Sequence, residues 1–230
     1  MYFITGDTHR DFSNIEYFCT KFNTTKEDTM IVLGDAGLNY FLNNSDLNVK
    51  QKVSNLPIKF FFIRGNHESR PQNISTYKEK EYCGSYAYFE DRFPDLAFAK
   101  DGEIYTIEDK SILTIGGAYS IDKEYRIVNR FQWFEDEMLS SDEMSDILNK
   151  YKGVKVDCIL SHTAPNSEIP YYMLPSSLAA IPNIDKTMED WLDKIKENIE
   201  HQKWFCGHFH IEYMSKGNCR FMYKDIVEFI

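Results

Sequence analysis

The sequence predicts an α/β fold in which the sheet carries antiparallel additions or is divided into two sheets. Three observations support this prediction. Short apolar runs end abruptly in Gly, Asp, Asn or His, as expected of strands that deliver polar residues at their carboxyl ends. Stretches with helical spacing of apolar residues lie between several of these runs. Elsewhere, two short runs joined by a polar turn indicate a hairpin rather than a helical crossover.

Strands and helices alternate along most of the predicted order. Residues 11–22 show helical spacing between the first two apolar runs, with Asp11 or Ser13 as a cap. Further helices are predicted within residues 42–55, before Pro57, and over 188–199, where apolar residues form a stripe. The predicted strands are Tyr2 to Thr5, Met30 to Leu33, Ile58 to Ile63, Ser111 to Ile115, Val156 to Leu160 and Lys203 to Cys206.

Antiparallel pairing is predicted in the second half of the chain. Residues 102–117 form two apolar runs joined by the polar turn from Glu108 to Ser111, and the tail over 219–230 is also strand-like. The sequence contains no internal repeat and no Gly/Ser linker, and its hydrophobic fraction of 43% is ample for one core. A single domain over residues 1–230 is therefore expected.

The charge balance limits the classes of partner. A formal net charge of -10 argues against an extended nucleic-acid groove, because binding by counterion release needs Lys and Arg clustered on one surface. An anionic substrate at a metal centre stays compatible with this charge, since bound dications reverse the local sign.

Cysteine usage and hydropathy predict the compartment. The five cysteines form no CxxC pair, which favours buried thiols in a reducing environment over a disulfide framework. The first residues, MYFITGD, lack the basic and apolar regions of a signal peptide, and no apolar run approaches the ~20 residues of a membrane span. We therefore expect a cytoplasmic protein with no membrane partner.

Five of the six histidines lie in compact polar segments where predicted strands end, and His201 alone lies outside them. A lone histidine is more often a core or surface residue than a ligand, so it is the clustering that favours metal binding. Asp7, Asp35 and Asn66 lie in matching contexts, each directly after a glycine. The histidine segments are GDTH with His9, GNHE with His67, LSHT with His162, and GHFH with His208 and His210.

Spacing gives a physical reason for convergence. In an extended segment, residues i and i+2 point to the same side, so Asp7 and His9 can approach one ion. His208 and His210 can face one cavity for the same reason. The preceding glycines permit sharp turns and close approach of the backbone to the site.

The donor types suggest the metal. Imidazole, carboxylate and amide donors suit borderline first-row ions better than calcium, and the set lacks the thiolates of a structural zinc site. Seven ligands exceed the needs of one ion, so we expect two divalent ions that share Asp35, about 3.5–4 Å apart, with a bridging water as nucleophile. Manganese is favoured, and iron, zinc, nickel and cobalt are alternatives.

The ordered series GDTH, GDAG, GNHE, SH and GHFH spans Asp7 to His210 and resembles the signature of the calcineurin-like metallophosphoesterase superfamily. The resemblance implies an α/β fold of two facing mixed β-sheets flanked by helices, a four-layer α/β/β/α sandwich, with the dimetal site at the strand ends. It also implies the ligand sets. The first ion takes Asp7, His9 and His210, the second takes Asn66, His162 and His208, and Asp35 bridges them.

The residue that follows Asn66 has an implied catalytic role. His67 resembles the family's general acid, which protonates the leaving alkoxide or stabilises the transferring phosphoryl group, and Glu68 would orient it. A hydrogen-bonded loop residue is the alternative for His67. The chain departs from the phosphoprotein phosphatases, whose second motif continues as G-D-x-V-D-R-G, because AGLNY follows Asp35 here. Protein phosphatase activity is correspondingly disfavoured.

Several arginines are candidate phosphate-binding residues, since a guanidinium fork matches phosphate oxygens. Arg10 adjoins His9, Arg70 follows GNHE, and Arg126 ends a segment, 116–126, that either reaches the pocket or is an ordinary turn into a helix. A surface or ion-pairing role is the alternative for each arginine. The irregular stretch 164–186 forms a pocket rim or lid, or a plain surface loop.

The predicted function is hydrolysis of a phosphomonoester or phosphodiester, with a small phosphate ester or nucleotide as substrate, by attack of a metal-bridging hydroxide. One alternative is a nuclease or nucleotide phosphodiesterase of the same superfamily. Another is a non-catalytic protein-binding scaffold, which is disfavoured because every ligand and His67 are present. The sequence leaves the substrate and the oligomeric state open.

Overall fold

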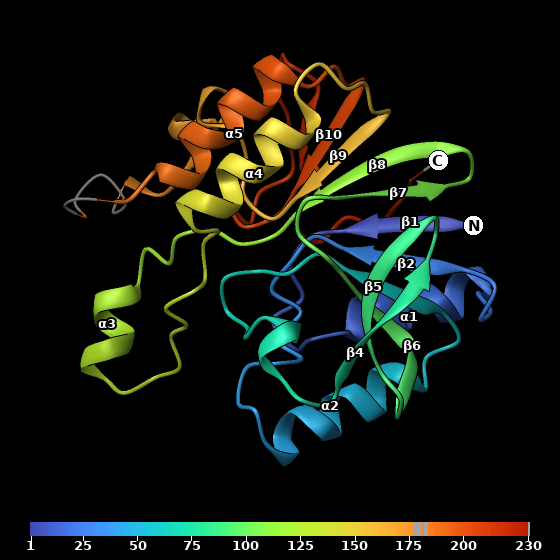
Figure 1. The fold of residues 1–230 in the computed structure, drawn as a ribbon. Coiled ribbons are helices and arrows are strands. Elements are labelled where there is room, and N and C mark those ends of the chain that lie inside the picture. Colours follow the sequence, from blue (N-terminus) through green and yellow to red (C-terminus); the bar gives the residue numbers. More distant parts are fainter. Residues whose placement is uncertain (177–180, 182–183, 230) are drawn as a thin grey trace.

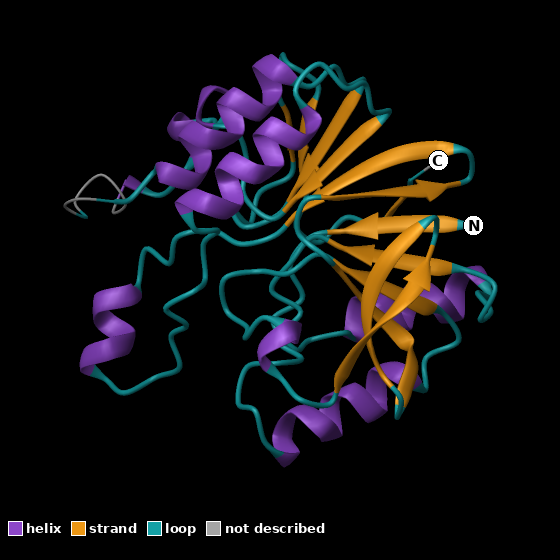
Figure 2. Ribbon diagram, in the orientation of Figure 1, coloured by secondary structure: helices purple, strands orange, loops and turns teal. Residues whose placement is uncertain are grey.

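The computed structural model describes residues 1–176, 181 and 184–229, and in it two β-sheets pack face to face between two layers of helices (Figures 1 and 2). One sheet has seven strands and the other six. The order of layers is helix, sheet, sheet, helix. The predicted α/β class with two facing mixed sheets is therefore confirmed.

The seven-stranded sheet has the order β13-β1-β2-β3-β6-β5-β4. Its centre is parallel, from β1 through β2 and β3 to β6, and β13, β5 and β4 add antiparallel edges. The strands are β1 (Tyr2–Thr5), β2 (Thr29–Val32), β3 (Lys59–Phe62), β4 (Tyr77–Tyr82), β5 (Ser85–Glu90), β6 (Phe93–Ala99) and β13 (Val227–Glu228).

The six-stranded sheet has the order β11-β12-β10-β9-β8-β7. Strands β12, β10, β9 and β8 run parallel, while β7 pairs with β8 as the predicted hairpin and β11 pairs antiparallel with β12. The strands are β7 (Glu103–Ile107), β8 (Lys110–Ile115), β9 (Cys158–Ser161), β10 (Lys203–Cys206), β11 (Tyr213–Met214) and β12 (Cys219–Phe221).

Alternation of side chains along β3 shows how the layers are built. Phe60 and Phe62 pack on one face with residues of the neighbouring helices, whereas Phe61 and Ile63 pack on the other face against the second sheet. Both faces are covered, so all four side chains are buried. This double burial explains why the run is continuously apolar rather than alternating, as is usual for parallel strands inside α/β proteins.

Helices cover the outer face of each sheet (Figure 2). Helices α1 and α2 contribute to the apolar cluster on the seven-stranded sheet, and α4 and α5 to the cluster on the six-stranded sheet. The α-helices are α1 (Ser13–Phe22), α2 (Asn44–Ser54), α3 (Lys123–Val128), α4 (Ser141–Tyr151) and α5 (Thr187–Asn198), and the 3-10 helices are η1 (Pro71–Asn73), η2 (Asn166–Glu168) and η3 (Tyr171–Met173).

The segment 121–136, named the arm below, contains α3 and differs from the other helical regions. No residue of the arm is buried, and the segment projects away from the two sheets (Figure 1). Tyr125 and Val128 are 61% and 77% exposed. The arm is therefore held by polar contacts at a few positions rather than by an apolar face.

The remaining connections bear on two predictions. Residues 116–126 lead from β8 into α3, and Arg126 at the end of this segment contacts His67, so the segment has features of both predicted alternatives. The stretch predicted as a rim, lid or loop, 164–186, contains η2 and η3, and part of it, 177–180 and 182–183, lies outside the described residues. In the part that the structure describes, no helix is long and apolar enough to cross a membrane.

Candidate metal centre and catalytic site

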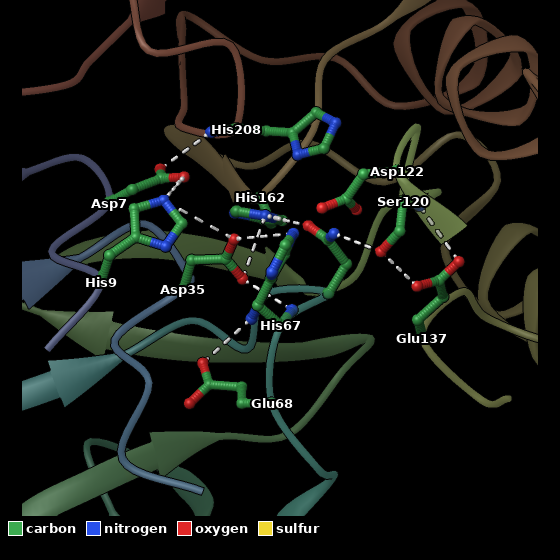
Figure 3. A network of polar contacts seen from close by, with 12 residues as sticks. Asp7, His9, Asp35, His67, Glu68, Ser120, Asp122, Glu137, His162 and His208 are labelled. Atoms are coloured by element: carbon green, nitrogen blue, oxygen red, sulfur yellow. Dashed lines mark hydrogen bonds and ion pairs between the residues drawn. The ribbon is translucent and has the colours of Figure 1, made fainter. Parts of the chain in front are cut away.

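The predicted ligands follow the carboxyl ends of five parallel strands, and Figure 3 shows Asp7, His9, Asp35, His162 and His208 among them. The loops after β1, β2 and β3 come from one sheet, and those after β9 and β10 come from the other. The seven-stranded sheet supplies two aspartates, an amide and His9, and the six-stranded sheet supplies the other three histidines. Strands that run parallel end at one edge of their sheet, which is why segments far apart in sequence meet here.

Backbone groups anchor one oxygen of each aspartate. The His208 N–H donates to Asp7 Oδ1 at 2.9 Å, and the His67 N–H donates to Asp35 Oδ1 at 2.8 Å. Both carboxylates are buried, and each keeps its Oδ2 turned toward histidine rings. Asp35 and His208 also have positive φ angles of 45° and 66°, a conformation that non-glycine residues adopt mainly where the surroundings impose it.

One group of donors comprises Asp7, His9 and His210, whose ligand atoms all lie within 4.8 Å of one another. Asp7 Oδ2 lies 3.1 Å from His210 Nε2 and 3.6 Å from His9 Nε2. The two Nε2 atoms are themselves 2.9 Å apart. Two ring nitrogens and one carboxylate oxygen at such distances match the donor set that first-row divalent ions prefer.

A second group forms around His162. Its Nδ1 lies 2.8 Å from the Leu33 carbonyl oxygen, which can only accept, so Nδ1 carries a proton. Its Nε2 lies 2.8 Å from Asn66 Oδ1 and 3.7 Å from Asp35 Oδ1. Asp7, Asp35 and His162 also form a cluster of potential ligand atoms within 4.8 Å.

A chain of hydrogen bonds fixes the orientation of the Asn66 amide. The buried Glu137 carboxylate accepts from both the N–H and the hydroxyl of Ser120, and the Ser120 oxygen accepts from Asn66 Nδ2 at 2.7 Å. Asn66 therefore presents its oxygen to His162 Nε2. In a neutral His162 these two atoms are both acceptors, so a proton or a metal cation is required between them. The carboxylates of Asp7 and Asp35, which cluster with His162, favour a metal ion over a proton at this position.

Electrostatics keep these groups in their ligating forms. Burial lowers the pKa of His208 to about 3, so that its ring is neutral at physiological pH. Burial alone would raise the pKa of Asp35, but its close approach to the His162, His67 and His9 rings and the hydrogen bond from the His67 N–H hold it below its usual range. The His208 ring lies beside that of His162, with centroids 5.0 Å apart. Neutral imidazole and ionised carboxylate are the forms that bind metals.

Two glycines make the close approach of the loops feasible. A Cβ at Gly65 would lie 1.9 Å from Asp35 Oδ1, and a Cβ at Gly34 would lie 2.0 Å from His162 Nδ1. Gly34 also has a φ of +102°. Neither position has room for a side chain, because a ligand residue already occupies that space.

Comparison with known families gives a match to the calcineurin-like phosphoesterase model over residues 2–212. The chain belongs to this family. It is a metal-dependent phosphoric ester hydrolase, as the sequence motifs predicted. Among curated proteins, no significant match was found.

Two solved structures are among those similar to this phosphoesterase. Phosphopantetheinyl hydrolase from Mycobacterium tuberculosis is 13% identical, with a TM-score of 0.50 over 96% of this chain and 87% of that chain. A serine/threonine phosphatase from Saccharomyces cerevisiae is 16% identical, with a TM-score of 0.36 over 96% of this chain and 66% of that chain. At such identities the likeness concerns the fold alone.

The arginines of the phosphoesterase differ in their placement. The guanidinium of Arg10 bonds to Gly37 O, the Asp46 carboxylate and Ser45, and it lies over the Phe41 ring. These contacts tie the loop after β1 to the start of α2. The predicted phosphate contact of Arg10 stays a prediction, and its observed partners favour a structural role.

Arg70 is engaged in a similar way. Its guanidinium pairs with Glu143 at the start of α4 and bonds to the backbone oxygens of Asp136 and Met138. Arg70, which directly precedes η1, therefore connects this part of the chain to the end of the arm and to the segment before α4. A phosphate contact stays a prediction for Arg70 as well, and these bonds favour the alternative of an ion-pairing residue.

Arg126 is the predicted arginine that reaches the centre. Its Nη2 lies 2.5 Å from His67 Nδ1, although α3 itself stands outside the two sheets. Glu68, by contrast, accepts from the Gly65 N–H at 3.2 Å, so the polar partner described for His67 Nδ1 is Arg126 and not Glu68. Burial raises the pKa of Glu68 to about 8.

Ser120 and Glu137 were not predicted as site residues, although they orient Asn66. A signal was present in the sequence, because GGAYS follows β8 in the same way that glycine-flanked polar segments follow the other ligand-bearing strands. Glu137 carried no such signal. It lies beyond the arm, and only the path of the chain returns it to the end of β8.

Proposed function

We propose that this metallophosphoesterase binds two divalent ions and hydrolyses a small phosphate ester or nucleotide. Asp7, His9 and His210 would hold the first ion. Asn66, His162 and His208 would hold the second, and Asp35 would contribute to both. The observation that carries the proposal is the pair of acceptor atoms, Asn66 Oδ1 and His162 Nε2, held 2.8 Å apart by independent hydrogen bonds.

Asp35 and His67 would have separate roles in the reaction. When bound, two ions would activate water and neutralise the charge of the phosphoryl group. Asp35 stays ionised between the two donor groups, and backbone bonds keep its carboxylate from rotating. His67 Nε2 lies 3.9 Å from Asp35 Oδ2, which places this ring nitrogen at the mouth of the centre. From there it can act on the leaving alkoxide or on the transferring phosphoryl group.

The metal, the substrate class and the cellular location are inferred from the donor types, the net charge and the cysteines. The mixed nitrogen and oxygen donors favour manganese, with iron, zinc, nickel or cobalt as alternatives. A net charge of -10 supports small substrates over a long nucleic acid. Free cysteines support a reducing, cytoplasmic location. The apolar cluster shared by both sheets supports one domain over residues 1–230.

The test combines metal content with turnover. Metal per chain is measured on the purified protein, and monoesters, cyclic and linear diesters, nucleotides and phosphopeptides are assayed with Mn²⁺. We expect about two ions per chain and turnover of one class, strongly reduced in His67→Ala. His201→Ala is the matched control, because this histidine lies outside the centre and contacts the Ile199 carbonyl and the Trp204 ring.

Two results would contradict the proposal. A wild-type protein that takes up metal but turns over none of the esters would favour the protein-binding scaffold. A protein that takes up one ion or none would exclude the dinuclear centre.

A further inference from the structure

The contact between Arg126 and His67 determines which nitrogen of the imidazole carries the proton. An arginine guanidinium is always protonated and can only donate hydrogen bonds. Because Arg126 Nη2 lies 2.5 Å from His67 Nδ1, Nδ1 must accept. The ring proton is then on Nε2, the nitrogen 3.9 Å from Asp35 Oδ2.

The guanidinium is itself fixed in place. Its Nε donates to Asp122 Oδ2 at 2.8 Å, and its Nη1 donates to the Tyr40 hydroxyl at 3.0 Å and to Gln132 O at 3.2 Å. Together with His67, these partners use four of the five N–H donors within the described residues. The Arg126 side chain is 14% exposed. Little of it is left to bind a phosphate group, which was its predicted role.

We propose that Arg126 is a positioning residue that holds His67 as the neutral Nε2–H tautomer. His67 then acts as a hydrogen-bond donor to the transferring phosphoryl oxygens and not as a proton donor to the leaving group. The chemistry supports this choice, since loss of the Nε2 proton from a ring whose Nδ1 is unprotonated would create an imidazolate. This inference deepens the proposed function and rests on it.

The arm gains a defined role from this assignment. Asp122, Arg126 and Gln132 all belong to the arm, so the orientation of His67 depends on a segment with no buried residue. Tyr40, which belongs to the loop after β2, receives the remaining bond. The arm and the GNHE loop are thus linked through one guanidinium, and displacement of the arm would release the His67 ring.

The first measurement is the tautomer itself. The protein is labelled with ¹⁵N-histidine and loaded with diamagnetic Zn²⁺, and long-range ¹H–¹⁵N spectra report which ring nitrogen carries the proton, with His67→Gln identifying the signals. We expect protonated Nε2 and bare Nδ1 in wild type, and a tautomer mixture in Arg126→Gln. Protonated Nδ1 in wild type, or an unchanged pattern in Arg126→Gln, would overturn the inference.

Kinetics provide the second measurement. With the ester that turns over, Arg126→Gln should lower kcat about 10-fold with little change in KM, as expected for one hydrogen bond to a charged group. The loss should be similar for esters with good and poor leaving groups. Arg130→Gln, an exposed arginine on the same arm, is the matched control and should leave kcat unchanged.

Two kinetic outcomes contradict the assignment. A raised KM at unchanged kcat would identify Arg126 as a phosphate-binding residue. A loss in His67→Ala that grows steeply as the leaving group becomes poorer would identify His67 as a general acid. If no ester is turned over, the proposed function fails, while the tautomer in the labelled protein still decides the role of Arg126.

Discussion

The strand-end loops and the arm both reach the same centre, but they are held in opposite ways. Asp7, Asp35 and His162 are buried, and their orientation is fixed by backbone hydrogen bonds and by glycines without room for a side chain. The arm buries no residue and meets the centre through Arg126. The candidate metal ligands therefore belong to the buried core. The contact that orients His67 comes from a segment that buries no residue, so substitutions in that segment should leave the core intact.

The largest effect is expected at the shared carboxylate. Asp35→Asn keeps the shape but removes the charge that both donor groups face, so we expect a loss of activity on the order of 1,000-fold, equivalent to several kcal/mol. Metal content should fall in parallel. Asp91→Asn, in the turn after β5, where the carboxylate forms an exposed ion pair with Lys78 of β4, is the control and should behave as wild type. Full activity in Asp35→Asn would remove the distinction between core and arm.

The second largest effect is expected from steric crowding between the loops of the core. Gly65→Ala should destabilise the protein by about 3 kcal/mol, because the added methyl group meets Asp35 Oδ1 and the Asp35 backbone nitrogen. Urea unfolding measures the loss, and metal content reports displacement of Asp35. Gly153→Ala separates sterics from backbone strain, since a Cβ there meets nothing within 4 Å although φ is +76°. Equal losses in the two variants would argue against crowding.

A smaller effect is expected at the group that orients Asn66. Ser120→Ala removes the hydrogen bond to Asn66 Nδ2 and should weaken metal binding about 10- to 100-fold, as is usual for partners behind a ligand. Titration with Mn²⁺ measures the affinity. Ser167→Ala, which removes an exposed hydroxyl bonded to Asp193, is the control. Unchanged affinity in Ser120→Ala would mean that the Asn66 amide needs no external support.

The smallest effect on stability is expected in the arm. Val128→Ser removes an exposed apolar side chain, so the free energy of unfolding should change by less than about 0.5 kcal/mol. The same substitution at a core position, Val53→Ser, should cost several times more, since Val53 is 1% exposed. Urea unfolding compares the two. A large loss at Val128 would show that the arm packs against something in solution.

The ligand-bearing strands were predictable because each carries two independent signals. An apolar run marks the strand, and a polar segment, flanked by glycine after every one of these strands except β9, marks its end, so β1, β2, β3, β8, β9 and β10 were located to within two residues. The hairpin β7–β8 and helices α1, α2 and α5 also agree with the predictions.

Other elements were missed for physical reasons. Strand β4, with the sequence YKEKEY, is an exposed edge whose alternation has no apolar face to reveal it. Strands β5 and β6, which follow β4 in the sequence, were not predicted either. Helix α4 carried a usable signal that was not recognised, because Ser140 and Glu143 form a capping box and Met144, Ile147 and Tyr151 follow at helical spacing.

The residues of the candidate site likewise fall into those that the sequence predicts and those that it does not. The ligand residues were predictable because metal chemistry requires particular side chains at short spacing. Glu137 and the contact of Arg126 with His67 were not, because both depend on where the arm returns to the core. For the arginines, proximity in sequence favoured Arg10 and Arg70 as phosphate ligands; that role stays a prediction, and their guanidinium groups bond to structural partners.

The bond from the His208 backbone to Asp7 joins residues separated by 201 positions. Synthesis proceeds from the amino terminus at about 5–20 residues per second, so Asp7 leaves the ribosome many seconds before its partner exists. Until then the backbone N–H that anchors Asp7 Oδ1 is missing from the nascent chain. Strands β9 and β10 of the six-stranded sheet are thus made after the other ligand-bearing strands, and the loops that follow them complete the set of candidate metal ligands with His162, His208 and His210.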